Sequence, residues 1–396
     1  MRVLCSTTAG SGHFGPLVPF ARACQDAGHE VRVAAPASFA AAVTGAGFAH
    51  VPFDDVPADV MGAVFGRLPS LSYEEANRVV MADVFGRLDA QAALPGVTAA
   101  IGEWKPDLVL REPCEFASLV AADRAGVAQV QVAIGLDVML LAVGPFLDAP
   151  LRELAAMADL PPERAVDLFT TTPQLSCVPA TLDDIGDAEM STGRGPTARR
   201  VFRFRDASTS PSDAALPPSW GDPDDPLVYV SYGSVTAALP HLAPVYAASL
   251  EALRDAPMRV LLTTGSAIDP ADLGPHPANI RVEPWWPQAD VMPHAAAVVG
   301  HGGFGTTMLA LAAGVPQVVV PLFAADQHIN ARCVAAAGAG IHLAGGVDAV
   351  ADLPDALERV TTDPSYRACA SEIASEIADL PPTATAVPVL ERLASA

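Results

Sequence analysis

Short apolar runs alternate with helical patterns along this chain, and the whole alternation occurs twice. In the first half, strand-like runs and the helical patterns after them lie at residues 3–6, 16–27, 31–34, 37–46, 108–110 and 116–125. In the second half, strand-like runs separated by helical patterns lie at residues 227–231, 259–263, 280–282, 297–299 and 317–320. Such alternation is typical of βαβ units, whose strands form parallel sheets. The sequence therefore predicts an α/β fold with two parallel-sheet domains.

The segment between the two halves predicts a domain boundary. Residues 206–226 read DASTSPSDAALPPSWGDPDDP, and their density of Pro, Ser and Asp is typical of a linker. We expect an N-terminal domain at 1–205, the linker, a C-terminal domain at 227–380 and a terminal helix at 381–396. With 396 residues, of which 51% are hydrophobic and 17% charged, the chain can bury two substantial cores.

Composition excludes several classes of partner. The formal net charge of −22 argues against binding to nucleic acid and against stable association with anionic membranes. Met1 leads directly into a strand-like run rather than a signal peptide, and no apolar run reaches membrane-spanning length. The 6 cysteines show no CxxC spacing, which favours reduced core residues. We expect a cytoplasmic protein that binds small molecules.

A glycine-rich turn in the second half predicts an anion site. The strand-like run that ends at Val299 is followed at once by GHGGFG, where the backbone must turn sharply. A helical pattern then begins near Thr306 and stops before Gly314 and Pro316. The start of a helix offers free N–H groups and the positive end of a dipole, which suits a phosphate group. His301 lies beside this position.

Four segments together point to a known family. They read MRVLCSTTAGSGHFGPLVPFARACQDAGHEVRVAAP at the N-terminus, PDLVLREPCEFASLVAA at 106–122, LVYVSYGSV at 227–235, and WWPQADVMPHAAAVVGHGGFGTTMLALAAGVPQVVVPLFAADQ at 285–327. In content and order they resemble the GT-B glycosyltransferases of the family 1 type, specifically bacterial natural-product enzymes that move deoxysugars from TDP-sugars, such as the calicheamicin glycosyltransferases. The resemblance covers nearly the whole chain. It implies two Rossmann-like domains facing each other across a cleft, with the acceptor in the N-terminal domain and the terminal helix at 381–396 crossing back to that domain.

His13 is the candidate catalytic base. It follows a glycine-containing turn after the first predicted strand, so it should stand at the carboxyl end of the sheet, where α/β proteins bind ligands. A neutral imidazole is suited to removing the proton of an attacking hydroxyl. Glu112 follows the strand at 108–110 and is the candidate partner of His13, with Glu115 as the alternative. Glu112 could instead only complement a helix dipole. The resemblance implies the catalytic role.

The resemblance also implies the donor-binding residues. Trp285 would stack on the base, Gln288 would fix the nucleoside edge, and Asp326 and Gln327 would bond the sugar hydroxyls, unless that pair simply forms a turn. The full implied set is Ser11, Gly233, Ser234, Trp285, Gln288, His301, Gly303, Gly305, Thr306, Asp326 and Gln327. We expect no metal and no cofactor besides the TDP-sugar co-substrate, because the DxD-like cluster Asp222, Asp224 and Asp225 lies in the predicted linker.

Residues 54–94 lie outside the regular βαβ alternation and are rich in Met, Phe, Leu and Val. Within them the pentapeptide VFGRL occurs twice, at 64–68 and 84–88. Two interpretations are open, namely ordinary amphipathic helices packed on the core, or an apolar acceptor pocket. The resemblance favours the pocket, with Met61, Phe65, Met81 and Phe85 as acceptor-binding residues.

The function implied is inverting, metal-independent transfer of a deoxysugar from a TDP-sugar to a hydroxyl of a hydrophobic natural-product aglycone in antibiotic biosynthesis. A preference for TDP over UDP is expected because Leu309 stands where related UDP-sugar enzymes carry a ribose-binding glutamate. The alternatives are a nucleotide-sugar epimerase of the same fold and a non-catalytic nucleotide-sugar-binding protein. The aglycone, the sugar, the atom attacked (O, N, S or C) and the choice between monomer and homodimer stay open.

Overall fold

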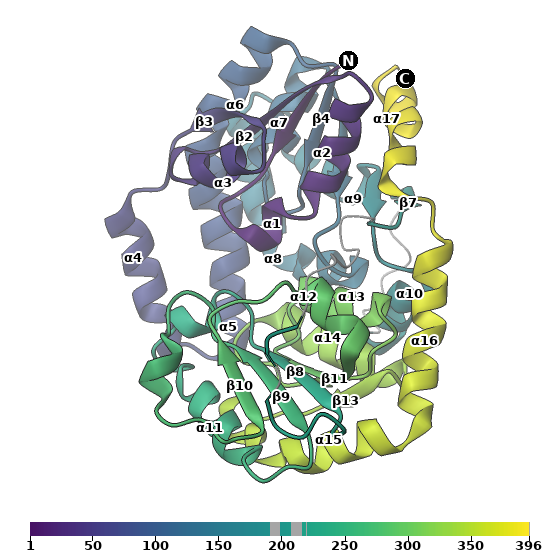
Figure 1. The fold of residues 1–396 in the computed structure, drawn as a ribbon. Coiled ribbons are helices and arrows are strands. Elements are labelled where there is room, and N and C mark those ends of the chain that lie inside the picture. The colour runs from purple at the N-terminus through teal and green to yellow at the C-terminus, as the bar shows by residue number, and fades with distance from the viewer. Residues whose placement is uncertain (191–198, 207–215, 219, 396) are drawn as a thin grey trace. The chain divides into compact units, whose positions relative to one another are not determined.

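The computed structural model describes residues 1–190, 199–206, 216–218 and 220–395. The chain divides into two compact units (Figure 1). Unit 1 contains Met1–Cys177, Met190–Ala207 and Leu380–Ala396, and unit 2 contains Val178–Glu189 and Ser208–Asp379. Unit 1 therefore differs from the predicted N-terminal domain of residues 1–205 in two main segments, since Val178–Glu189 belongs to unit 2 and the terminal segment Leu380–Ala396 belongs to unit 1. Much of the predicted linker, at 207–215 and 219, lies outside the described residues.

Unit 1 is built on a seven-stranded parallel sheet with the order β3-β2-β1-β4-β5-β6-β7. Its strands are β1 Arg2–Ser6, β2 Glu30–Pro36, β3 Ala49–Phe53, β4 Leu108–Arg111, β5 Ala128–Val132, β6 Gln174–Ser176 and β7 Val201–Arg203. Every strand pairs in parallel with its neighbour, so the connections must cross over through helices.

Helices cover both faces of this sheet, while α4 and α5 of the same unit lie away from it (Figure 1). The helices of unit 1 are α1 Ser11–Phe14, α2 Leu17–Asp26, α3 Ala40–Gly45, α4 Ala58–Arg67, α5 Tyr73–Arg78, the π-helix η3 Val79–Asp89, α6 Ala90–Trp104, α7 Ala117–Ala125, α8 Asp137–Met157, α9 Pro162–Thr171 and α17 Val387–Ala394. Side chains alternate along β1, so Leu4 packs with α6, α7 and α8, whereas Val3 and Cys5 pack with α2 and α17.

Unit 2 is a second parallel α/β unit, with six strands in the order β10-β9-β8-β11-β12-β13. The strands are β8 Leu227–Ser231, β9 Arg259–Thr263, β10 Ile280–Glu283, β11 Ala295–Gly300, β12 Gln317–Val319 and β13 Gly340–His342. The helices are α10 Ala180–Met190, α11 Pro244–Ala252, α12 Gln288–Val291, α13 Phe304–Ala312, α14 Ala325–Ala336, α15 Leu353–Thr362 and α16 Pro364–Asp379. Two parallel-sheet units confirm the predicted fold class.

The strand order places the carboxyl ends of particular strands side by side. In unit 1 the first strand, β1, lies between β2 and β4, so the chain reverses its direction of progress across the sheet between β1 and β4. Unit 2 has the same arrangement, with β8 between β9 and β11. Parallel α/β sheets bind ligands at such reversal points, where the loops after the two strands separate.

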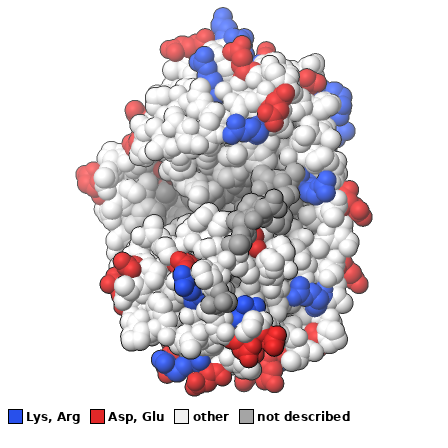
Figure 2. Space-filling view, viewed as in Figure 1, with Lys and Arg blue, Asp and Glu red and all other residues white. Residues whose placement is uncertain are grey.

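The distribution of surface charge and the lengths of the helices are consistent with the composition. The charged side chains on the face in Figure 2 are scattered, and the described Lys and Arg residues form no large patch there. Among the described helices, none combines the length and the apolar character that crossing a bilayer requires.

Candidate active site

His13 is held at the reversal point of unit 1 by a short turn after β1. Gly10 adopts a φ of 141°, which a residue with a side chain rarely adopts, and its carbonyl accepts bonds from the N–H groups of His13 and Phe14 at 3.2 and 3.0 Å. The four-residue helix α1 begins there, and the His13 side chain stays 22% exposed. A ligand can therefore reach its ring.

Glu112 holds His13 from the adjacent strand. Its Oε2 lies 3.2 Å from Nδ1 of His13, and its side chain is fully buried. Oε1 accepts bonds from the N–H and hydroxyl of Thr8 at 3.2 and 3.0 Å, while Oε2 accepts one from the Cys114 N–H at 2.6 Å. Burial alone would raise the pKa of Glu112, but the attraction of His13 and these bonds together lower it. Glu112 is therefore ionised and can stabilise an imidazolium.

Glu115 has a different place. Its carboxylate accepts bonds from the N–H groups of Ala117 and Ser118 and from the Ser118 hydroxyl, so it caps the start of α7. The alternative role considered for Glu112, a carboxylate at the start of a helix, is the role that Glu115 has. Of the two candidates, Glu112 is the one in contact with His13.

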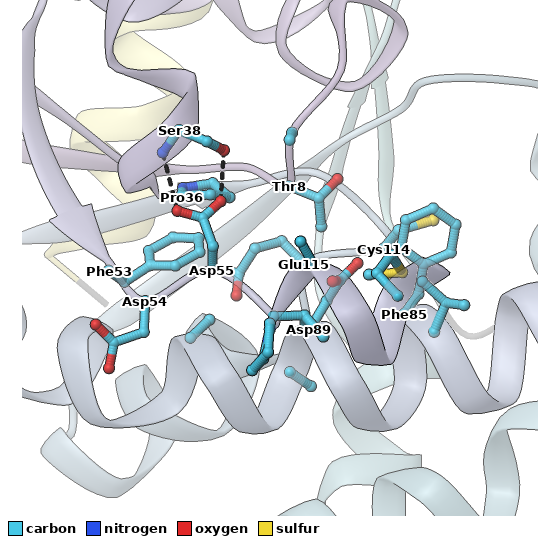
Figure 3. A pocket seen from close by; sticks show the side chains of 18 of the residues that line it. Thr8, Pro36, Ser38, Phe53, Asp54, Asp55, Phe85, Asp89, Cys114 and Glu115 are labelled. Carbon is cyan, nitrogen blue, oxygen red and sulfur yellow. Dashed lines mark hydrogen bonds between the residues drawn. The ribbon is translucent and has the colours of Figure 1, made fainter. Parts of the chain in front are cut away.

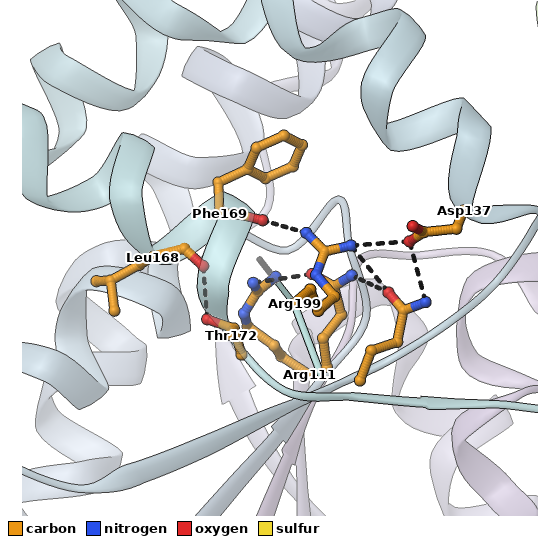
Figure 4. A network of polar contacts seen from close by, with 8 residues as sticks. Arg111, Asp137, Leu168, Phe169, Thr172 and Arg199 are labelled. Atoms are coloured by element: carbon orange, nitrogen blue, oxygen red, sulfur yellow. Dashed lines mark hydrogen bonds and ion pairs between the residues drawn. The ribbon is translucent and has the colours of Figure 1, made fainter. Parts of the chain in front are cut away.

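A buried polar network fixes the end of β4 (Figure 4). Arg111 is fully buried and donates to the backbone oxygen of Glu112 at 3.2 Å and to Gln131 Oε1 at 3.0 Å. Arg199 lies in the same network and pairs with Asp137 at 3.1 Å. Burial lowers the pKa of Arg111 to about 10, which leaves it a cation at neutral pH. The strand end that carries Glu112 is therefore rigid and lies beside a positive charge.

Among the described residues, one group of three side chains could bring metal-ligand atoms together, and it contains the same pair. The ligand atoms of His13, Glu112 and Cys114 all lie within 4.8 Å of one another. Both Glu112 oxygens already accept hydrogen bonds, which competes with coordination. The DxD-like cluster lies before β8, where the Asp224 N–H bonds Asp222 at 3.0 Å in an exposed turn.

A cavity of about 870 Å³ opens beside the pair, within unit 1 (Figure 3). Thr8 and Cys114, which bond Glu112, line it, and so does Phe85, whose ring centroid lies 5.2 Å from that of His13. Met61 and Phe65 of α4 also line it. Met81, the fourth predicted acceptor-binding residue, is not among the residues that line this cavity, and its side chain packs against the core.

Asp89 is one of several cavity residues that the sequence analysis did not propose. Asp89, the last residue of η3, lines the cavity near His13. Burial, reinforced by Glu112, Glu115 and Asp55 and opposed by His13, raises the pKa of Asp89 to about 6. In an α-helical interpretation of residues 54–94 nothing distinguishes this aspartate from an exposed one.

In unit 2 the loops after β8 and β11 come together around His301. A Cβ on Gly233 or on Gly303 would lie 2.5 Å from Cε1 of His301, so both glycines are required for the ring to fit. Burial lowers the pKa of His301 to about 4, and its ring stacks at 6.4 Å on Phe323. The imidazole is therefore neutral at pH 7 and can contribute a hydrogen bond to an anion, rather than a preformed charge.

The helix after this loop starts two residues earlier than the sequence pattern indicated. α13 begins at Phe304 with Gly303 as its N-cap, and no described side chain caps it. Its first N–H groups are open to an anion. Thr306 and Gly305 lie in this first turn, and Ser234 is exposed after β8.

Of the other predicted donor-binding residues, Gln288 and Trp285 are placed where they could meet a ligand, whereas Gln327 is occupied within the protein. Gln288 links the two loops, since it donates to Ser231 Oγ at 3.3 Å and accepts from Thr306 Oγ1 at 3.1 Å. Trp285 is 69% exposed and offers a free aromatic face. Gln327 instead is buried, and its Oε1 accepts bonds from the N–H groups of Leu322 and Phe323 at 2.9 and 3.1 Å.

Two predicted residues stand apart from these groups. Asp326 lies in the first turn of α14 and is half-buried. Ser11 belongs to unit 1, where it is the exposed first residue of α1. The structure thus gathers Gly233, Gln288, His301, Gly303 and Thr306 in one place.

The whole chain matches known proteins. Residues 22–211 and 250–393 match the N-terminal and C-terminal domains of the family described as erythromycin biosynthesis protein CIII-like. The chain belongs to this family. Its members are glycosyltransferases with the GT-B fold.

Individual relatives agree with this assignment. An L-demethylnoviosyl transferase of Streptomyces niveus is 33% identical over 96% of this chain and 95% of its own length. An aklavinone 7-beta-L-rhodosaminyltransferase of Streptomyces galilaeus is 31% identical over 99% of this chain and 96% of its own. The solved structure of the glycosyltransferase VinC in complex with dTDP is 27% identical, covers 100% of both chains and has a TM-score of 0.74. This glycosyltransferase therefore has a sugar donor and an acceptor as its substrates.

Proposed function

We propose that this glycosyltransferase transfers a deoxysugar from a TDP-sugar to a hydroxyl of a hydrophobic aglycone, with inversion at the anomeric carbon. The observation that carries the proposal is the contact of 3.2 Å between His13 and a buried, ionised Glu112 beside a largely apolar cavity. The names of the two Streptomyces relatives support the deoxysugar, and the dTDP bound to VinC supports the nucleotide.

In the proposed reaction, Nε2 of His13 takes the hydroxyl proton while the acceptor oxygen attacks the anomeric carbon. One carbon–oxygen bond forms as the bond to the diphosphate breaks, and TDP leaves with the bonding electron pair. Glu112 keeps Nδ1 protonated and offsets the positive charge that develops on the ring. A single displacement needs no enzyme nucleophile and inverts the configuration.

The departing diphosphate would be stabilised in unit 2 without a metal ion. The uncapped first turn of α13 presents N–H groups and the positive end of its dipole, and His301 lies against the same loop. These groups are preorganised by Gly233 and Gly303, so they need not rearrange when charge develops.

The nucleotide preference is proposed from Leu309. This residue of α13 is partly buried and packs with an apolar cluster that includes Trp286 and Val298. It cannot accept a bond from a ribose 2′-hydroxyl, and TDP lacks that group. A nucleotide-sugar epimerase is disfavoured by the apolar acceptor cavity, and a purely binding protein by the His13–Glu112 pair.

Product analysis tests the proposal. The protein is incubated with TDP-deoxysugars and a panel of hydrophobic aglycones, products are detected by mass spectrometry, and the anomeric configuration is determined by NMR. We expect a glycoside whose configuration is opposite to that of the donor. A retained configuration would contradict the single displacement.

A further inference from the structure

The winding of η3 decides which of its side chains reach the cavity. Val80, Val84, Phe85 and Asp89 of this segment all line it. With about 4.4 residues per turn in a π-helix, the nine steps from Val80 to Asp89 make about two turns, so the two side chains share a face. In an α-helix of about 3.6 residues per turn, the same nine steps would place Asp89 about 180° from Val80. The π winding therefore places Val80 and Asp89, which both line the cavity, on one face of the segment.

Packing holds this winding in place. Gly86 lies so close to α8 that a Cβ on it would approach Cβ of Pro150 to 2.8 Å. Arg87 is paired with Glu153 of α8 at 2.7 Å and with Asp83 one turn earlier at 3.0 Å. Contacts with α8 therefore hold η3 in place, and Asp89 at its end lines the cavity.

The Asp89 carboxylate has acceptor capacity that the protein leaves unused. In the described part of the chain it takes part in no hydrogen bond or ion pair, whereas two other acidic residues that line the cavity, Asp55 and Glu115, do accept hydrogen bonds. Asp55 accepts bonds from the N–H and hydroxyl of Ser38, and Glu115 caps α7. Figure 3 shows Asp89 pointing from the helix into the cavity, toward Glu115. No described Lys or Arg lines the cavity.

We propose that Asp89 is an acceptor-specificity residue, whose carboxylate accepts a hydrogen bond from a second polar group of the acceptor, a hydroxyl or a protonated amine. This inference rests on the proposed function. Phe85 contacts the His13 ring and lies one turn before Asp89, so an acceptor held at Asp89 has its body against Phe85 and its reacting hydroxyl at His13. Acceptors with an anionic group are disfavoured, because four carboxylates and no cation line the cavity.

Binding of four matched probes tests this assignment. They are 2-naphthol, 2,6-dihydroxynaphthalene, 6-aminomethyl-2-naphthol and 6-hydroxy-2-naphthoic acid, titrated into the full-length protein in the presence of TDP. We expect the dihydroxy and aminomethyl compounds to bind about 10-fold tighter than 2-naphthol, and the acid to bind more weakly than 2-naphthol. Comparison of the dihydroxy compound with the aminomethyl compound separates a neutral hydrogen-bond donor from a cationic one.

The variants assign the preference to one side chain. Asp89→Ala should abolish the tighter binding of the dihydroxy and aminomethyl compounds, and it should leave the affinity for 2-naphthol unchanged within about 2-fold. Asp89→Asn should lose the preference for the amine and keep part of the preference for the hydroxyl. Asp26→Asn, an exposed aspartate on α2, is the matched control and should behave as the wild type. A preference that survives Asp89→Ala, equal loss of 2-naphthol affinity in that variant, or binding of none of the probes would overturn the inference.

Measuring transferase activity distinguishes a failure of the proposed function from a failure of the role proposed for Asp89. His13→Ala should abolish transfer but keep the probe preference, because Asp89 is untouched. A preference that depends on Asp89 in a protein without transferase activity would contradict the proposed function alone.

Discussion

Replacing Asp89 by Asn should make the protein more stable at neutral pH, although it removes the proposed acceptor contact. The pKa of Asp89 is raised from 3.8 to about 6, chiefly by burial. Between these two values the folded state binds more protons than the unfolded state, so stability falls as the pH rises from about 4 to about 6. Above that window the full penalty is present, and an Asn side chain does not incur it.

The size of the effect follows from the two pKa values. The difference between 3.8 and about 6, at about 1.4 kcal/mol per pH unit, gives a penalty of about 3 kcal/mol at pH 7.5. At pH 4.5 most carboxyls at this position are protonated in the folded state, and the same relation leaves about 1 kcal/mol.

Urea unfolding of wild type and Asp89→Asn at pH 7.5, 6 and 4.5 measures this difference. The transition that contains unit 1 should shift to higher urea at pH 7.5, and the shift should shrink as the pH falls. Asp26→Asn controls for the loss of one charge at an exposed position. A gain of equal size at pH 7.5 and 4.5 would refute the electrostatic argument, and so would no gain at pH 7.5.

Three further results follow from the proposed mechanism. His13→Ala should lower the rate of transfer by about 10² to 10⁴ while TDP binding, measured by calorimetry, stays nearly intact, because the proposed base and the proposed nucleotide site lie in different units; an active variant would remove His13 from the mechanism. Transfer should continue in EDTA, and a loss of activity that added Mg²⁺ or Mn²⁺ restores would contradict the role given to α13 and His301. TDP should bind more tightly than UDP, with a difference of about 1 to 3 kcal/mol, and Leu309→Glu should narrow that difference; equal or tighter binding of UDP to the wild type would refute the argument from Leu309.

Local sequence predicted most of the framework. The runs at 227–231 and 259–263 coincide with β8 and β9, and the run at 3–6 lies inside β1. These strands are buried on both faces, so their apolar character is nearly continuous and easy to recognise. Strands β3, β5, β6, β7 and β13 were missed, because β6, β7 and β13 have three residues each, β3 lies partly exposed, and the apolar residues of β5 (AQVQV) are interrupted by glutamines.

The amino-acid sequence by itself determined two α/β units, and it identified His13, Glu112 and the glycine turn around His301 as functional candidates. Each follows a strand directly, so its place at the carboxyl end of a sheet depends only on local order. The sequence could not choose between Glu112 and Glu115, which are three residues apart. Strand order decided it, because β4 pairs with β1 and brings Glu112 to His13 while Glu115 caps α7.

The repeated pentapeptide shows what tertiary structure adds. Residues 64–68 begin in the exposed helix α4, whereas the identical residues 84–88 lie in the π-helix η3 packed on α8. Five identical residues therefore take two windings, and Gly86 and Arg87 of the second copy contact residues more than sixty positions away, whereas a Cβ on Gly66 of the first copy would meet nothing within 4 Å. In this winding Asp89 lines the cavity, whereas Met81 packs against the core. The pentapeptide alone cannot predict which winding it takes, because the winding also depends on the residues that the fold packs against it.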